Sequence, residues 1–177
     1  MSQAQIAGGS VTQDNDLPSK GYRLREFELM DAHGGFIHLS DFRGRANLII
    51  IVSDDRPETS KLMEDIAVRY SEIKSSEAEV LAIVHTSLKS AGEIKRKGNL
   101  PYLVLNDDEG CVHRKFGAVD SKGRDSGAVY ITDRFGEVYG AYRTAGGEAL
   151  PSFIDILNWL EFVNAQCPEC EAPEWPV

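Results

Sequence analysis

The sequence has few cysteines, no excess of positive charge and no long apolar run, and each shortage excludes a class of protein. Only three of its 177 residues are cysteines, too few for the disulfide framework of a small secreted domain. The formal net charge of −9 leaves no basic stripe to bind the phosphates of a nucleic acid. The apolar run at residues 48–52 is far shorter than the roughly 18 residues of a membrane span. We therefore expect neither nucleic acid nor a membrane as a partner.

The N-terminal stretch lacks both apolar periodicity and the basic-then-apolar order of a secretory signal, which predicts a cytoplasmic protein. Its Gly, Ser, Gln, Asn and Asp residues predict a flexible arm over residues 1–20. The remaining length suits one hydrophobic core, so we predict a single domain at 21–166. Residues 167–177 then form a C-terminal tail.

Within this predicted domain, strand and helix patterns alternate. Residues 47–52 and 80–84 are continuous apolar runs of the kind found in strands buried on both faces of a parallel sheet. Apolar spacing and turn residues predict the other elements: a hairpin around residues 34–35, helices from residue 57 onward, at 87–97 and at 150–166, a strand at 102–105, a short helix at 111–116 and a hairpin at 127–142. This order predicts an α/β, thioredoxin-like fold: a central mixed sheet flanked by helices, with an extra N-terminal β-hairpin.

Two stretches also carry a resemblance to a known family. They are FELMDAHGGFIHLSDFRG at residues 27–44, which leads into the first buried strand, and YITDRFGEV at residues 130–138. Together they resemble the AhpC/TSA branch of thioredoxin-fold proteins, which is the peroxiredoxin-like or redoxin branch, over roughly residues 22–165. The resemblance implies an antioxidant protein with thiol peroxidase or thiol–disulfide oxidoreductase activity, and a thiol reductant as its partner.

The resemblance further implies a cysteine in the first turn of the helix after the central strand. A helix N-terminus lowers the pKa of a thiol and so favours the reactive thiolate. The corresponding stretch here, SDDRPETS at residues 53–60, contains no cysteine. On a Cys-Pro-x-Cys pattern Arg56 and Thr59 take the two thiol positions, and on the peroxiredoxin pattern Ser60 falls at or near the cysteine.

What this stretch does contain is a helix start. We expect Asp55 to accept hydrogen bonds from the first-turn N–H groups and Glu58 to complete a capping box. A hydroxyl of Thr59 or Ser60 could replace the thiol only with a general base beside it. His85, after the second buried strand, is the histidine expected at the same edge of the sheet; the alternative is that it only begins the next loop.

A second family feature faces the reacting cysteine: a cis-proline or an arginine just before the hairpin strand. The resemblance places this position at about Gly127, so both halves of the family site are altered. Arg124 or Arg134 could supply a positive charge nearby.

Cys111 is the one cysteine inside the predicted domain. It lies near the start of a short helix, which favours a thiolate, but acids precede it and oppose one. The alternative is that Cys111 is a small, half-buried apolar residue.

The tail holds the other two cysteines, Cys167 and Cys170, as Cys-Pro-Glu-Cys. This spacing beside a βαβ pattern indicates a redox dithiol. The end of a helix and the neighbouring glutamates hold the thiol pKa at or above about 8.5, so we expect a slow nucleophile unless Trp175 and its prolines fold the tail back toward the vacant site or Cys111.

Three interpretations of the tail and of the chain remain open. The first is a redox role through the dithiol. The second is a zinc-linked dimer, because two thiolates are half of a four-ligand zinc site. The third is a catalytically silent module that recognises a protein partner through the old active-site edge. Apart from such a zinc ion, we predict no cofactor.

Overall fold

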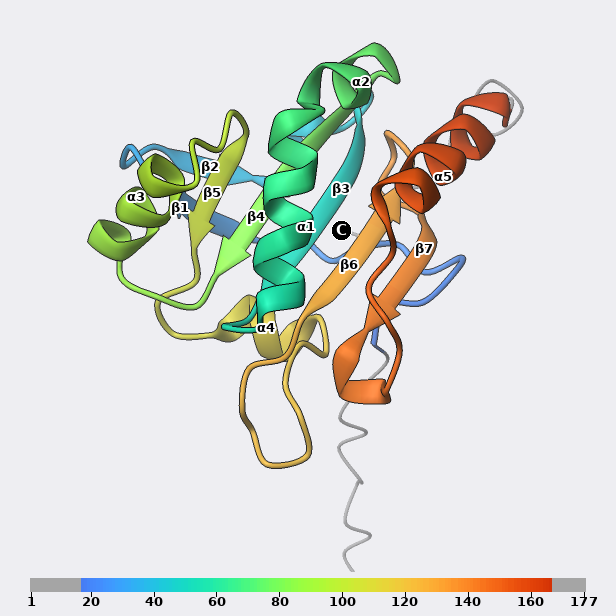
Figure 1. The fold of residues 1–177 in the computed structure, drawn as a ribbon. Helices are drawn as coiled ribbons and strands as arrows, with labels where there is room; N and C mark the ends of the chain where they lie inside the picture. Colours follow the sequence, from blue (N-terminus) through green and yellow to red (C-terminus); the bar gives the residue numbers. More distant parts are fainter. Residues whose placement is uncertain (1–16, 167–177) are drawn as a thin grey trace, which may run out of the picture.

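Two fully buried parallel strands, β3 (Asn47–Ser53) and β4 (Ala78–Val84), form the centre of the fold. The computed structural model describes residues 17–166 and places seven strands in one sheet, in the order β2-β1-β5-β4-β3-β6-β7 (Figure 1). The other strands are β1 (Glu28–Asp31), β2 (Phe36–His38), β5 (Leu103–Asn106), β6 (Ala128–Thr132) and β7 (Val138–Arg143). The pairs β3–β4 and β4–β5 are parallel and the remaining pairs are antiparallel, so the predicted mixed sheet and N-terminal hairpin are confirmed.

Helices cover both faces of this sheet. One face packs against α1 (Pro57–Val68), α2 (Tyr70–Ser75), α3 (Leu88–Lys97) and α5 (Phe153–Ala165). The other face packs against residues 24–27, the short helix η1 (Leu39–Phe42) and α4 (Cys111–Lys115). A last short helix, η2 (Thr144–Gly146), follows β7.

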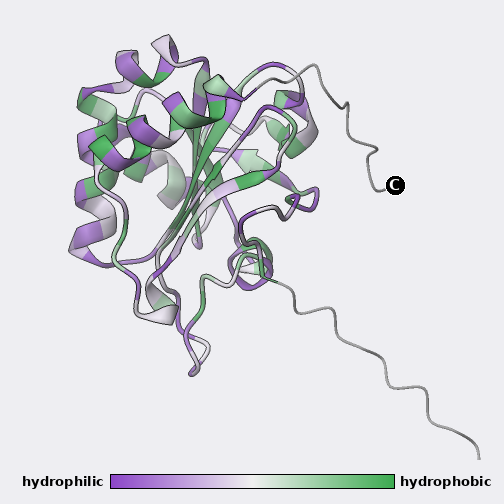
Figure 2. Ribbon diagram, turned by 90° about the vertical axis from the view of Figure 1, so that its right-hand side faces the viewer, coloured by the Kyte–Doolittle hydropathy of each residue, from purple (hydrophilic) through white to green (hydrophobic). Residues whose placement is uncertain are grey.

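Strict alternation along β3 explains why residues 48–52 are all apolar. Ile49 and Ile51 belong to the core under α1 and α5, whereas Ile50 and Val52 belong to the core under α4. Since both faces are covered, neither set of side chains can be polar. Figure 2 shows the result: hydrophobic colour follows the central strands, and hydrophilic colour lies on the outer sides of the helices.

The structure differs from two expectations about element boundaries. The helix predicted from residue 57 through Tyr70 and Ile73 is two helices, because the backbone of Arg69 leaves the helical region with φ −112° and ψ 21°. Within the predicted arm, Pro18 is buried and its carbonyl oxygen accepts a 2.7 Å hydrogen bond from Arg143 Nη1. Residues 1–16 of that arm lie outside the described residues.

A buried ion pair fastens α4 to the end of the sheet. His113 is fully buried and Asp107 nearly so, and His113 Nδ1 lies 2.8 Å from Asp107 Oδ2. The other ring nitrogen, Nε2, lies 2.9 Å from the carbonyl oxygen of Ser53, the last residue of β3. Asp107 Oδ2 also accepts a 2.8 Å hydrogen bond from the backbone N–H of His113. One carboxylate therefore caps α4 and orients a histidine that reaches the central strand.

Both partners of this pair have shifted pKa values. Burial lowers the pKa of His113, but the hydrogen bond to Asp107, the contact with Ser53 and the charge of Asp107 outweigh it, so the net shift is upward. Burial raises the pKa of Asp107, but hydrogen bonds from the His113 side chain and from the backbone of His113 and Val112 outweigh it, so the net shift is downward. The charged pair stabilises the fold most between the two unfolded-state values, about pH 4 to about pH 6.5.

We predict that Asp107→Asn lowers the free energy of unfolding by about 3 kcal/mol near pH 5.5, because it leaves a buried histidine without its anion. The difference from the parent shrinks as the pH rises through the raised pKa of His113, where the parent pair also loses its charge. Urea unfolding of the parent and the variant at several pH values between 5 and 9 measures this difference in the free energy of unfolding.

Asp108→Asn is the matched control, because Asp108 is the neighbouring aspartate and its side chain is exposed, so its loss should change little. A difference between parent and Asp107→Asn that stays constant from pH 5 to pH 9 would contradict the charged state of the pair.

Candidate functional site at the carboxyl edge of the sheet

The first turn of α1 is closed by a hydrogen bond between two buried side chains. Thr59 is 1% exposed, and its hydroxyl donates to Asp54 Oδ1 over 2.5 Å. The same oxygen accepts a hydrogen bond of 3.2 Å from the backbone N–H of Arg56, the residue that caps α1. Asp54 thus supplies the oxygen that the helix start requires.

The expected capping box of Asp55 and Glu58 is therefore wrong. Both side chains are exposed, and the N-cap residue, Arg56, makes no side-chain capping bond. Asp54 takes the role because its side chain, directly after β3, is buried beside the helix start, whereas Asp55 is exposed to solvent.

Gly127 faces this closed turn from the neighbouring strand. A Cβ atom at Gly127 would lie 2.9 Å from Thr59 Oγ1 and 3.5 Å from each carboxylate oxygen of Asp54. Such close approach excludes a side chain at this position unless Thr59 moves. Thr59 and Gly127 therefore do lie side by side, and the hydrogen-bonded side chains of Thr59 and Asp54 fill the space between them.

Neither expected arginine brings its charge to Gly127. Arg124 Nε donates to Asp120 Oδ2 over 2.8 Å within its own loop, and hydrogen bonds from Arg124 lower the pKa of Asp120 to about 2. Arg134 Nη2 lies 3.1 Å from Glu77 Oε2, just before the amino end of β4 and so at the opposite edge of the sheet. The expectation for Arg134 is wrong because β6 carries it away from the α1 end.

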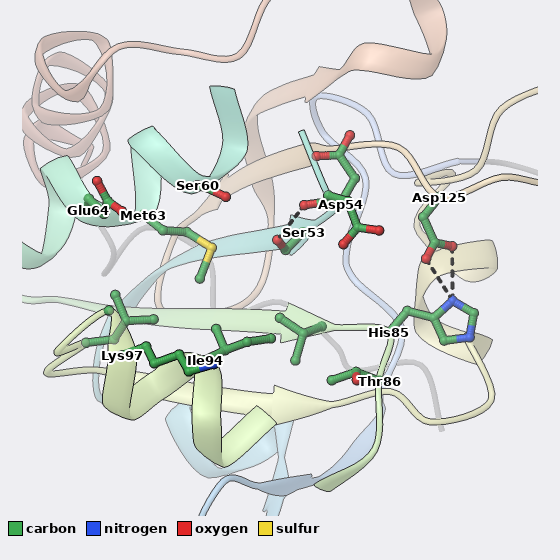
Figure 3. Close-up of a pocket in the computed structure, with 14 residues that line it drawn as sticks. Ser53, Asp54, Ser60, Met63, Glu64, His85, Thr86, Ile94, Lys97 and Asp125 are labelled. Atoms are coloured by element: carbon green, nitrogen blue, oxygen red, sulfur yellow. Dashed lines mark hydrogen bonds and ion pairs between the residues drawn. The ribbon is translucent and has the colours of Figure 1, made fainter. Parts of the chain in front are cut away.

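A cavity of about 560 Å³ opens beside the same edge, between α1 and α3 (Figure 3). Ser60 and His85 both line it, as expected for residues at the carboxyl ends of parallel strands. Within residues 17–166, however, Ser60 forms no hydrogen bond with His85, and Figure 3 shows the two side chains on different walls. The cavity therefore does not assemble a nucleophile with its base.

His85 instead pairs with a loop aspartate. Its Nδ1 lies 2.9 Å from Asp125 Oδ2, and both side chains are about one third exposed. The ring also lies beside that of His113, with ring centroids 5.4 Å apart, and close to the backbone of Gly110. His85 thus ties the loop before β6 to the end of β4, and Asp125 orients its ring toward the cavity wall.

Cys111 is an exposed residue at the first position of α4, so the half-buried alternative is wrong. Its Sγ lies 3.4 Å from Arg114 Nη2 and 3.7 Å from Glu109 Oε2. A cation and an anion thus lie beside the same thiol. The helix begins after a left-handed turn at Gly110, and the two residues that follow Cys111, Val112 and His113, are buried.

Cys167 and Cys170 lie outside the described residues, and α5 ends directly before them at the other edge of the sheet. In its last turn, the Asn164 side chain accepts a 2.6 Å hydrogen bond from Asn47, at the start of β3, and donates one of 2.9 Å to Ser76 O. Figure 1 shows the end of α5 opposite the start of α1.

Sequence reasoning missed two acidic residues of the cavity, Asp54 and Asp125. Asp54 directly follows the buried strand β3, and this position at the carboxyl edge of the sheet could have identified it as a site residue. Asp125 reaches the cavity only through a loop whose course no local pattern defines. Among residues 17–166, no group of three or more His, Cys, Asp or Glu side chains could hold a metal ion. No helix in this described part is long and apolar enough to cross a bilayer.

The chain is similar to curated peroxiredoxins of the Q and Bcp types. It is 31% identical over 127 residues to a putative chloroplastic peroxiredoxin Q of Oryza sativa subsp. indica, a match that covers 70% of this chain and 58% of the relative. It is 28% identical over 90 residues to peroxiredoxin Bcp of Bacillus subtilis, covering 50% of this chain and 57% of that protein. The chain thus matches somewhat over half the length of these relatives.

Solved structures with the same fold also come from this group. The peroxidoxin BcpB of Mycobacterium tuberculosis has a TM-score of 0.71 at 17% identity, with 82% of this chain and 98% of that chain covered. A thiol peroxidase from Chromobacterium violaceum has a TM-score of 0.67 at 20% identity, with 86% and 91% covered. These structures confirm the predicted thioredoxin-like fold. Since the model of the AhpC/TSA family matches residues 21–142, the chain belongs to the AhpC/TSA family.

Proposed function

We propose that this chain is a peroxiredoxin Q/Bcp-like protein whose first α1 turn no longer carries the reacting thiol, and that its redox role runs through Cys167 and Cys170. The observation that carries the proposal is the Thr59–Asp54 hydrogen bond, which occupies the helix start where the resemblance requires a thiolate. No cysteine lies between residue 1 and Cys111. The location in the cytoplasm stays a prediction.

The closed turn is a poor site for a substitute nucleophile. Thr59 is almost fully buried, so a substrate has no access to its hydroxyl. Asp54 accepts a hydrogen bond from this hydroxyl, but a carboxylate is too weak a base to deprotonate an alcohol, which is far less acidic than a thiol. Ser60 is exposed, and among residues 17–166 its hydroxyl forms no hydrogen bond with a histidine or a carboxylate.

Chain length supports a separate place of action for the tail. Cys170 follows Gln166 by four residues, which span at most about 14 Å. The strand β3, which separates Asn47 at the α5 end from Ser53 at the α1 end, is about 20 Å long. We therefore expect the dithiol to act on a partner molecule at the α5 edge, and not on the α1 turn or Cys111 of its own chain.

The proposed chemistry is thiol–disulfide exchange. One tail thiolate attacks a sulfur of the partner's disulfide, forms a mixed disulfide and releases a partner thiolate, which takes up a proton. The second tail thiol loses its proton and its thiolate attacks the tail sulfur of the mixed disulfide, which releases the second partner thiol and leaves a Cys167–Cys170 disulfide. Two electrons pass to the partner, and a thiol reductant restores the dithiol.

A second candidate function is a silent binding module. The cavity beside α1 favours it, because the cavity lies at the edge of the sheet where the family resemblance places the reacting group, yet it holds no assembled nucleophile. This function needs no chemistry from the tail.

We predict that reduction of a disulfide substrate at the expense of a thiol reductant falls to background in the Cys167→Ser, Cys170→Ser double variant. The variant Cys111→Ser is the matched control and should keep the parent rate, because Cys111 is exposed at the other edge of the sheet. The measurement is turnover with reductant in excess. Activity that persists without both tail thiols would overturn the proposal.

We also predict that Asp54 opposes a thiolate in the first turn of α1. In a background without the three native cysteines, Thr59→Cys should give a thiol with a raised pKa, because the Asp54 carboxylate lies beside it. Adding Asp54→Asn should lower that pKa by about one unit, which is about ten times more thiolate near neutral pH. Titration of thiolate ultraviolet absorbance measures the pKa independently of access to reagents.

Ser60→Cys is the control for this test, because the Asp54 carboxylate bonds to Thr59 and not to Ser60, so Asp54→Asn should change the pKa of the thiol introduced at position 60 less. An unchanged pKa at position 59 after Asp54→Asn would show that the carboxylate does not hinder thiolate chemistry there.

The zinc-linked dimer is tested by metal analysis of the full chain. Four thiolates from two chains would hold one zinc ion, so the expected content is about half an equivalent per chain, lost in the Cys167→Ser, Cys170→Ser variant. Metal-free protein with two titratable tail thiols would exclude this alternative.

A further inference from the structure

Four aromatic side chains of β7 and α5, which lie side by side at one edge of the sheet (Figure 1), form an aromatic cluster: Tyr139, Tyr142, Trp159 and Phe162. The Phe162 ring lies edge-on to the rings of Tyr139 and Trp159, with ring centroids 6.1 Å and 5.9 Å away. Trp159 Nε1 donates a 2.7 Å hydrogen bond to the hydroxyl oxygen of Tyr142. Contacts between the rings thus join the helix to the last strand.

The aromatic cluster is held in place and yet is accessible to solvent. Phe162 is 46% exposed, and the other three side chains are partly exposed. Gly140 of β7 lets the indole approach the strand closely, because a Cβ atom there would lie 3.3 Å from Trp159 Nε1. Large apolar side chains that are exposed side by side mark a binding surface, whereas single exposed ones do not.

A surface of Tyr, Trp and Phe rings suits a proline-rich segment. Segments with the pattern Pro-x-x-Pro dock on such rings, because the proline residues hold an extended backbone and lose little conformational entropy on binding. Of the seven prolines in this chain, only Pro173 and Pro176 have this spacing, in the sequence Pro-Glu-Trp-Pro. Trp175, between them, adds a large apolar ring. This segment lies outside the described residues.

The same segment is tethered next to the aromatic cluster. Helix α5 ends at Ala165, and Phe162 precedes its cap residue Gln166 by four residues, a rise of about 6 Å. Trp175 follows Gln166 by nine residues, which reach at most about 30 Å. A tether of this length gives the segment an effective concentration on the order of millimolar at the aromatic cluster. Even a weak contact is then formed in a large share of the molecules.

We propose that the aromatic cluster is the docking site of this chain's own C-terminal segment, with Trp175 packed on Phe162 and the prolines Pro173 and Pro176 on the tyrosines of β7. Docking closes residues 163–174 into a loop and holds the Cys-Pro-Glu-Cys sequence beside the last turn of α5. A molecule that competes for the same rings releases this loop. The inference goes beyond the proposed thiol chemistry and does not depend on it.

Amide and indole chemical shifts of the ¹⁵N-labelled full chain, kept reduced, test the docking. Trp175→Ser should shift the signals of residues 139, 142, 159 and 162, because the ring current of a docked indole acts only on nuclei close to it. This variant leaves the sequence of the described domain unchanged. Glu171→Gln is the matched control, since it alters the same tail without removing an apolar contact, and should leave those signals in place.

The domain side of the contact is tested by Phe162→Ala. This change should move the Trp175 indole signal toward its position in the isolated peptide EAPEWPV, which is residues 171–177. Phe36→Ala is the matched control, because Phe36 is 61% exposed on β2, at the opposite edge of the sheet.

The same peptide also tests the chemistry of the surface. Added to the Trp175→Ser chain, it should cause saturable shifts at the aromatic cluster, with a dissociation constant on the order of millimolar. It should bind the parent several-fold more weakly, because the parent's own tail competes for the rings. Equal affinity for both chains would mean that the parent surface is unoccupied and would overturn the proposal.

Unchanged signals at the aromatic cluster in Trp175→Ser would also overturn it, as would equal effects of Phe162→Ala and Phe36→Ala on the Trp175 indole. Docking within one chain does not depend on protein concentration, so the shifts should persist on a roughly tenfold dilution. Shifts that fade on dilution would assign the surface to the tail of a second copy and contradict docking within one chain. None of these measurements uses turnover, so failure here leaves the exchange assay of the tail thiols unaffected.

Discussion

The buried pair of Asp107 and His113 is the contact on which the carboxyl edge of this fold depends. It caps α4, and through His113 Nε2 it reaches the carbonyl group that ends β3. His85 then lies against the same imidazole, and Asp125 holds His85. Three loops that follow or precede different strands are thus fixed through one carboxylate. The wall of the cavity beside α1 therefore depends on this pair, although neither Asp107 nor His113 lines the cavity.

The α1 turn shows a scaffold of this family whose first helical turn holds no cysteine. The parallel core of β3 and β4 is apolar on both faces and draws no stability from a thiol. Thr59, Asp54 and Gly127 pack together at the helix start, so the position is structurally satisfied. A scaffold with these contacts is free to retain its loops for recognition of a ligand, or to leave chemistry to another segment.

Much of the fold could be predicted from the sequence, because its main signals are local. The continuous apolar runs identified β3 and β4, and the turn residues identified both hairpins. The break at Arg69 could not be predicted, because the apolar spacing continues across it from Ile66 to Ile73. The placement of His85 at the α1 edge followed from strand direction alone. The position of its partner Asp125 could not be predicted in this way, because an irregular loop brings Asp125 to His85.

Two local errors have the same physical cause. Asp54 and Asp55 are adjacent and chemically identical, and only the course of the backbone between β3 and α1 decides which of them turns inward at the helix start. Cys111 stands between buried residues in sequence, yet its side chain faces solvent, because the backbone that enters α4 through the left-handed turn at Gly110 sets the direction of each side chain in that first turn. A sequence pattern identifies the residue types at such a turn, but the direction of each side chain depends on a backbone torsion that the pattern does not define.

The Asn164 side chain, bonded to both Asn47 and Ser76, has a consequence for encounters with other molecules. It holds the end of α5 in place, so under the proposed function of the tail a molecule docked at that end of the sheet is within chain reach of Cys167 and Cys170. A molecule docked at that end would meet them at a high effective concentration. One held in the cavity at the other end would not, so the domain itself keeps the two encounters apart.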